Sequence, residues 1–177
     1  MAYGFSRRGQ VSVTVRASVR IDRPPEDVAS VLLDADKAVL WTTALEKFEI
    51  LARPPGLVGS RARLHYRQGA RRYVMEDELL QAEPNRRYVS RVTGDAIEAH
   101  VETILTPISG ATRVDVRWAG SGKPLLLRLL LPFMRRSIAR QAQKDLVKLK
   151  ALVESEWRGK DRGQGSADDQ AEHIEAE

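Results

Sequence analysis

The order of two hydrophobic patterns limits the folds that this chain can adopt. Residues 11–120 alternate between apolar and polar side chains in short runs separated by turn signals, which is typical of β-strands. From about residue 124 to Trp157, apolar residues recur every three to four positions, as in a long amphipathic helix. Pro25 to Trp41 indicates two short helices after the first strand. The order predicts an α+β fold, with a curved antiparallel sheet of about seven strands wrapped on a long C-terminal helix.

Composition excludes several classes of protein. The 177 residues suit one domain, and the chain has no cysteine, so we expect neither disulfides nor thiolate chemistry. The histidines His65, His100 and His173 lack metal-binding spacing, and no phosphate-binding loop is evident. We therefore expect no metal and no cofactor. Residues 1–10 lack the apolar core of a signal peptide and no apolar run is long enough to span a membrane, so we expect a cytoplasmic protein.

Charge is unevenly distributed along the chain. The net charge is +5, but residues 160–177 carry two basic and six acidic side chains, which leaves +9 on the rest. We expect a flexible N-terminus at residues 1–10, an ordered domain at 11–157 and a disordered acidic tail at 158–177, because the tail has almost no bulky apolar residue.

The polar faces of successive strands alternate in charge sign. Along the chain they carry Arg61, Arg63, His65 and Arg67, then Glu76 and Glu78, then Arg87 and Arg91, then Glu98, His100 and Glu102, and finally Arg113, Asp115 and Arg117. Neighbouring strands of an antiparallel meander would place opposite charges side by side. This pattern explains most basic residues as partners in a solvated sheet face, so we expect no nucleic-acid binding.

The space between a curved sheet and one long helix is a natural place for an apolar ligand. If the valines of the first strand point inward, the same face of the other strands and the last helix should line this space. The residues that we expect to bind a hydrophobic ligand are Trp41, Tyr66, Tyr73, Met75, Tyr88, Ser90, Trp118, Leu130, Phe133, Met134 and Ile138. The alternative is that these residues fill an ordinary core.

Asp77 is the candidate catalytic residue. The alternation of Tyr73, Met75, Asp77 and Leu79 predicts that its side chain points inward. A buried carboxylate beside a ligand could remove a proton next to a carbonyl group. The alternative is a one-residue bulge, or a position at the end of the sheet, that leaves Asp77 in solvent beside Glu76 and Glu78.

The segment Leu125–Met134 is apolar nearly all round and is accompanied by Arg128, Arg135 and Arg136. Such a helix could make a transient membrane contact, cover the cavity, form a homodimer face, or simply be the buried start of the long helix. Pro132 should kink or divide that helix.

Several short motifs, in this order, carry a resemblance to a known family. They are Ile21-Asp22-Arg23-Pro24-Pro25-Glu26-Asp27-Val28, Leu33-Asp34 with Trp41, Val58-Gly59, Glu83-Pro84-Asn85-Arg86-Arg87, Gly110-Ala111-Thr112-Arg113-Val114 and Asp145-Leu146-Val147-Lys148-Leu149-Lys150. From about Val11 to Glu154 the chain resembles the START-like helix-grip (SRPBCC) superfamily, within it the polyketide cyclase/dehydrase and lipid transport group. The resemblance implies a helix-grip domain at 11–157 with an apolar ligand cavity.

The resemblance leaves two functions open, because the family includes binders, transporters and cyclases. The first is binding or transport of a hydrophobic small molecule, such as a lipid or polyketide, in a cavity between the sheet and the C-terminal helix. The second is an aromatase/cyclase-like or dehydratase-like enzyme that acts on a polyketide-type substrate. In that enzyme Asp77 would be the base, and Tyr66, Tyr73 or Tyr88 would orient the substrate.

Overall fold

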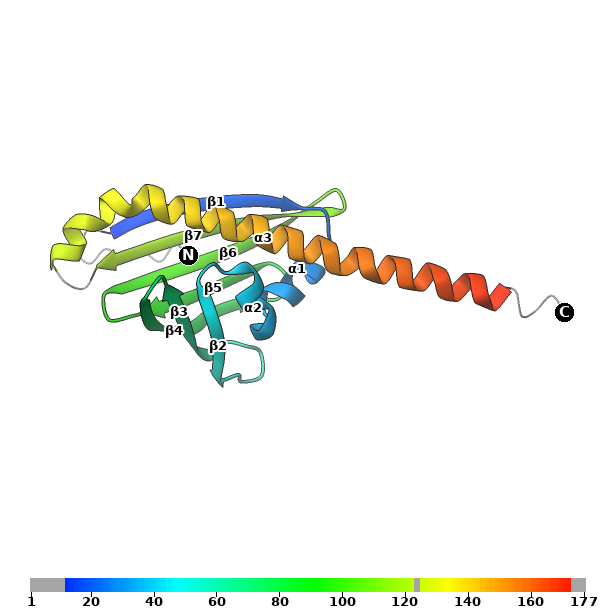
Figure 1. Cartoon of the computed structure of the whole chain (residues 1–177), viewed down its shortest axis with the longest axis horizontal. Coiled ribbons are helices and arrows are strands. Elements are labelled where there is room, and N and C mark those ends of the chain that lie inside the picture. Colours follow the sequence, from blue (N-terminus) through cyan, green and yellow to red (C-terminus); the bar gives the residue numbers. More distant parts are fainter. Residues whose placement is uncertain (1–11, 123–124, 173–177) are drawn as a thin grey trace.

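The computed structural model describes the chain over residues 12–122 and 125–172, and its side chains over residues 13–122 and 133–157. The predicted α+β helix-grip fold is confirmed (Figure 1). The elements are β1 (Ser12–Ile21), α1 (Pro25–Leu32), α2 (Ala35–Trp41), β2 (Leu45–Ala52), β3 (Arg61–Gln68), β4 (Arg71–Glu83), β5 (Arg87–Thr93), β6 (Ile97–Ile108), β7 (Ala111–Gly122) and α3 (Leu125–Glu172).

The seven strands form one antiparallel sheet in the order β1-β7-β6-β5-β4-β3-β2. Each strand from β2 to β6 pairs with the next along the chain, and β1 lies at the edge beside β7. Figure 1 shows α3 lying along β1 at one edge, whereas α2 lies toward β2 at the other edge. The inner face of the sheet therefore has two different covers.

The packed core lies where α3 meets β1 and β7. Alternation in β1 buries one side of the strand, and Ile21 has no exposed surface. Leu149 and Val153 of α3 and Val114 of β7 are equally inaccessible. Asp22, after β1, donates its backbone N–H to Glu154 Oε1 at 2.9 Å. The apolar face of α3 therefore packs directly on β1 and β7, with no other element between them.

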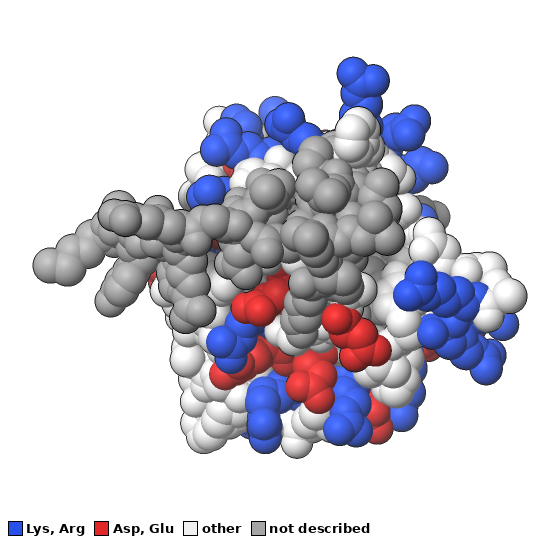
Figure 2. Space-filling view, turned by 90° about the vertical axis from the view of Figure 1, so that its left-hand side faces the viewer, with Lys and Arg blue, Asp and Glu red and all other residues white. Residues whose placement is uncertain are grey.

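The predicted alternation of charge across the outer face is confirmed by the strand register. Arg63 of β3 lies opposite Glu76 of β4, and Glu78 forms an ion pair with Arg91 of β5. Arg87 Nη2 lies 2.7 Å from Glu102 Oε1 on β6. Acidic and basic side chains also alternate across the lower part of the face seen in Figure 2. Much of the positive charge is therefore partnered by neighbouring carboxylates.

Helix α3 departs from the sequence expectation at both ends. It is one continuous helix through Pro132, so the proline does not divide it. It also continues past Gly159 to Glu172, and its C-terminal part projects beyond the sheet (Figure 1). A single glycine costs a helix only about 1 kcal/mol, too little to end one by itself. The domain limits at residues 10 and 157 stay predictions.

Over the described part of the chain, no helix combines the length and the hydrophobicity that a membrane crossing requires.

Candidate ligand-binding cavity

A cavity of about 290 Å³ lies between the inner face of the sheet and the two short helices. Strands β2 to β6 form one wall, and α2 with the end of α1 forms the other. Leu57, in the connection between β2 and β3, completes the enclosure. The lining is mainly apolar, with aromatic rings and a few polar groups, and includes Leu33, Ala38, Trp41, Phe48, Leu64, Tyr66, Asp77, Leu79, Tyr88, Ser90, Val92, Val101 and Thr103.

The position of this cavity corrects the sequence expectation. It was predicted between the sheet and the C-terminal helix, but none of the α3 side chains described, residues 133–157, lines it. The physical reason is that Leu146, Leu149 and Val153 of α3 pack directly against the β1–β7 side of the sheet and leave no space there. The gap opens farther along the sheet, where the cover consists of two short helices.

The structure brings together some of the residues predicted to bind a ligand. Trp41, Tyr66, Tyr88 and Ser90 all line the cavity. Tyr73 lies just behind it, stacked on Tyr66 with ring centroids 5.2 Å apart. Their contact with a ligand stays a prediction, but they share one space.

Other predicted residues lie elsewhere. Met75 packs beside the cluster of Ala38, Leu45 and Leu64 without lining the cavity. Trp118 and Ile138 pack with Val13 and Val15. Phe133 and Met134 are 84% and 44% exposed. The side chain of Leu130 lies outside the described residues. These placements remove Trp118, Ile138, Phe133 and Met134 from the cavity wall.

Trp118 illustrates why strand alternation alone overestimates the cavity. Its indole ring folds over Gly120 on the same strand, where a Cβ atom would lie 2.2 Å from Trp118 Cη2. The ring thus occupies space that only a glycine leaves free. An inward-facing aromatic side chain can pack against its own strand instead of lining a cavity, and the alternation of apolar residues does not reveal this packing.

Most of the lining residues were not among the predicted ligand contacts, and three of them show why. Val101 and Thr103 lie on the inward face of β6, which the alternation of that strand already indicated. Phe48 lies in β2, where a register irregularity between Leu45 and Lys47 obscures the alternation. The first two could have been found by following the face of one strand to the next.

Asp77 faces the cavity from the middle of β4. It lies opposite Ala62 of β3 and Val92 of β5, both of which line the same space. A bulge does occur in β4, but between Leu79 and Gln81, so it leaves the alternation at Asp77 intact. Of the two orientations that the sequence left open, the structure has the inward one, and the role of Asp77 as a base stays a prediction.

The surroundings of Asp77 favour its protonated form. Burial raises the pKa of its carboxyl group to about 6, and the negative charge of Glu78 adds to this. Ser90 Oγ donates a long hydrogen bond to Asp77 Oδ2 at 3.5 Å, which lowers the pKa only in part. The group therefore titrates close to neutral pH, where a carboxyl can both give and accept a proton.

Tyr66 lies near Asp77 and remains a hydrogen-bond donor. Burial raises the pKa of its hydroxyl, and Tyr73, Asp145 and Asp77 raise it further. Asp145 belongs to α3, and its Oδ1 accepts from the backbone N–H of Thr43 at 3.0 Å. The carboxylates of Asp77 on the sheet and Asp145 on α3 therefore both lie close enough to Tyr66 to act on its hydroxyl.

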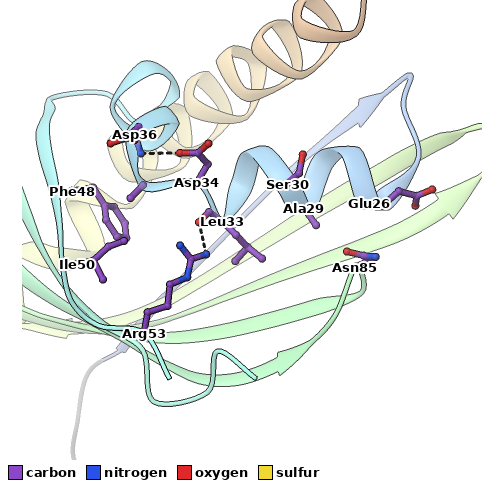
Figure 3. Close-up of a pocket in the computed structure, with 11 residues that line it drawn as sticks. Glu26, Ala29, Ser30, Leu33, Asp34, Asp36, Phe48, Ile50, Arg53 and Asn85 are labelled. Carbon is purple, nitrogen blue, oxygen red and sulfur yellow. Dashed lines mark hydrogen bonds between the residues drawn. The ribbon is translucent and has the colours of Figure 1, made fainter. Parts of the chain in front are cut away.

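An open groove adjoins the cavity at the surface. It has a volume of about 740 Å³ and shares Leu33, Phe48, Ile50 and Arg53 with the cavity lining. Figure 3 shows Arg53 reaching from the end of β2 to the end of α1, where its Nη2 donates to the carbonyl oxygen of Leu33 at 3.1 Å. The Arg53 side chain therefore lies at the border that the groove and the cavity share.

A curved antiparallel sheet that encloses an apolar cavity together with its helices defines the helix-grip class of protein. The family model for polyketide cyclase / dehydrase and lipid transport matches residues 12–154, and the chain belongs to this family. No match was found among curated proteins.

Solved structures share the fold at low sequence identity. TTHA0849 from Thermus thermophilus is 21% identical with a TM-score of 0.67, over 81% of this chain and 98% of that one. The Zhui aromatase/cyclase from a Streptomyces species is 18% identical with a TM-score of 0.68, over 81% and 94%. DR_A0006 from Deinococcus radiodurans is 26% identical with a TM-score of 0.57, over 78% and 95%.

Proposed function

We propose that the protein binds a hydrophobic small molecule, such as a lipid or polyketide, inside the cavity under α1 and α2. The observation that carries this proposal is the partly open, mainly apolar cavity of about 290 Å³ with an adjoining groove. Small-molecule sites are typically concave and apolar, with a few polar groups that orient the ligand. Membership of a family described by cyclase and lipid-transport activities supports the same function.

The dimensions favour a compact ligand. Ligand pockets typically measure about 300–1,000 Å³, so this cavity lies at the small end of the range. Trp41, Tyr66 and Tyr88 present aromatic surface to it. Aromatic side chains pack well against flat rings through offset stacking or edge contacts. A molecule of two or three rings suits this space better than a long acyl chain.

A fluorescent apolar probe tests the proposal. We expect N-phenyl-1-naphthylamine to bind the wild-type protein at one site per chain, with a rise in fluorescence. Val101→Phe would fill the cavity, because Val101 lines it, and should abolish this binding. Val74→Phe is the matched control: Val74 is 46% exposed on the same sheet, so the variant should keep one site. Equal binding by the two variants would contradict the proposal.

Native mass spectrometry would identify a natural ligand. The purified protein should carry a stoichiometric apolar compound that organic extraction releases, and Val101→Phe should carry none. If the compound remains in Val101→Phe, it occupies a different site and the proposed cavity is not the binding site.

A cyclase-like activity is the second candidate, favoured by the inward position of Asp77. Its carboxylate would take a proton from a carbon beside a carbonyl group of a polyketide-type substrate. The enolate would attack a second carbonyl carbon, and the alkoxide formed would take the proton back. Tyr66, whose pKa is raised by burial, would donate a hydrogen bond to the enolate oxygen. An aromatase/cyclase shares the fold.

Asp77→Asn separates the two candidate functions. In an enzyme, this variant should keep substrate binding while cyclisation of a linear polyketide mimic falls by about 10²-fold or more. Unchanged turnover in Asp77→Asn, or no turnover in the wild type with any such substrate, would leave binding as the function.

Contact with a membrane and formation of a homodimer through Leu125–Met134 stay predictions. Phe133 and Met134 are exposed, and Arg135 and Arg136 beside them are exposed as well. Sedimentation with anionic and neutral vesicles would test the first prediction, and light scattering of the purified protein would test the second.

A further inference from the structure

The cavity contains a negative charge with no cation placed to neutralise it among the described residues. Asp77 projects from β4 into a mainly apolar space, and the partner given by the structure is Ser90 at 3.5 Å. The charged neighbour that acts on it is Glu78, a second carboxylate. A buried carboxylate normally has a cation or several N–H donors around it. Here a bound ligand could supply the missing cation.

Two arginines border the cavity, but neither is placed to pair with Asp77. Arg61 is exposed and lies opposite Glu78 in the register, on the charged outer face. Arg53 lies at the groove, and its guanidinium donates to the Leu33 carbonyl oxygen (Figure 3). Neither guanidinium is among the groups that shift the pKa of Asp77.

Aromatic rings surround the same space. Trp41, Phe48, Tyr66 and Tyr88 all line the cavity, and Tyr66 lies close enough to Asp77 and Asp145 for both carboxylates to act on its hydroxyl. The face of an aromatic ring attracts a cation through its electron-rich π system, most strongly where water is excluded. Rings and a carboxylate in one small cavity form a combination that favours a positively charged organic group.

We propose that the ligand of this cavity is an organic cation, an amine carried on an aromatic or polycyclic body, whose ammonium group pairs with Asp77. The inference rests on the proposed function, because it specifies the ligand of the same cavity. The rings of the ligand lie against Trp41, Tyr66 and Tyr88, and its nitrogen donates to the carboxylate that Ser90 contacts. A ligand that carries a carboxylate of its own is repelled from this position.

Three naphthalene derivatives of similar size test the charge preference. The compounds are 1-naphthylmethylamine, 1-naphthalenemethanol and 1-naphthaleneacetate, the anion of 1-naphthaleneacetic acid. The affinity of each for the wild-type protein is measured at pH 8 by its displacement of N-phenyl-1-naphthylamine. We expect the amine to bind at least about 10-fold more tightly than the alcohol, a difference of about 1.4 kcal/mol, and the acid to bind most weakly. Only the charge of the substituent changes materially along this series.

Two variants locate the preference. Asp77→Asn should remove the advantage of the amine and leave the affinity for the alcohol within about two-fold, since the amide keeps the size of the carboxyl group. Glu78→Gln is the matched control, because it removes a carboxylate from the adjacent position on the outer face, where Glu78 pairs with Arg91. This control should retain the amine preference.

The outcomes separate this inference from the proposed function. Equal affinities for the three compounds, or an amine preference that survives in Asp77→Asn, would overturn the organic cation while leaving a hydrophobic binder intact. Tighter binding of the alcohol than of the amine would do the same. If N-phenyl-1-naphthylamine fails to bind the wild type at all, both the proposed function and this inference fail together.

Discussion

The two ends of the same sheet are covered differently, and only one of them encloses a cavity. On the β1–β7 side, α3 lies along the strands, and Ile21, Val114 and Leu149 are completely buried. On the β2–β6 side, the cover is made by α1, α2 and the connection after β2, and about 290 Å³ remains open. A long helix follows the strands and fills the space, whereas two short helices bridge it.

The chemistry of the two ends differs as much as their packing. The packed end contains aliphatic side chains and Thr112, whose Oγ1 donates to the Arg23 carbonyl oxygen at 2.7 Å. The open end contains Asp77 and Ser90 on its inner face, joined by a long hydrogen bond of 3.5 Å. The buried hydroxyl of Thr112 at the packed end thus has a good hydrogen-bond partner, whereas the carboxylate of Asp77 at the open end has a long hydrogen bond.

Truncating one leucine at each end of the sheet should give the largest difference in stability between the two ends. Leu149→Ala, in the packed end, should lower the free energy of unfolding by about 2–5 kcal/mol, because a cavity is left in close-packed surroundings. Leu64→Ala should cost less, since Leu64 already borders open space and has fewer partner atoms to lose. Urea unfolding of the two variants measures both values. Equal losses would mean that the cavity is filled by rearrangement in solution.

Enlarging one valine at each end gives the reverse test. Val114→Phe should destabilise the protein by about 1–3 kcal/mol or more, because Val114 has no exposed surface and no space beside it. Val101→Phe should cost clearly less, since the new ring can enter the cavity. Thermal unfolding of both variants measures the two losses of stability. A larger loss for Val101→Phe would contradict the presence of empty space on the β2–β6 side.

Removing the charge at Asp77 should stabilise the protein at alkaline pH. Its folded-state pKa of about 6 lies above the ordinary value of 3.8, so ionisation costs folding free energy. The cost is absent below about pH 4, grows as the pH rises to about 6 and is complete above it. Asp77→Asn should therefore be more stable than the wild type by about 1–3 kcal/mol at pH 8 and equally stable near pH 4.

Urea unfolding across this pH range measures the difference, and the neighbours of Asp77 define its control. The groups that interact with it are Tyr66 on β3, Ser90 on β5 and Glu78, the adjacent residue of its own strand on the outer face. Glu78→Gln should show a clearly smaller gain at pH 8, because it relieves only the repulsion between Glu78 and Asp77 and also removes the ion pair with Arg91. An equal gain in both variants would point to general charge repulsion on β4.

The sequence predicted the fold and the charged outer face because both follow from a strict period of two. The register that places Arg63 opposite Glu76 was readable for this reason. The cavity was harder, because its size depends on how closely two covers approach one sheet. Trp118 and Ile138 satisfied the inward pattern but packed against Val13 and Val15. The inward side of Asp77 could be read from the alternation because the bulge in β4 comes after it, whereas its role as a base stays a prediction.

The smallest effect is expected on the outer face, where the two ends of the sheet are alike. Arg87 on β5 lies 2.7 Å from Glu102 on β6, and both side chains are partly exposed. A double-mutant cycle of Arg87→Met and Glu102→Gln should give a coupling energy of about 0.2–1 kcal/mol, because solvent screens such pairs. Binding of N-phenyl-1-naphthylamine should not change, since neither side chain lines the cavity. A coupling above about 2 kcal/mol, well beyond the range for exposed pairs, or altered probe binding, would show that the outer ladder of charges also sets the shape of the inner face.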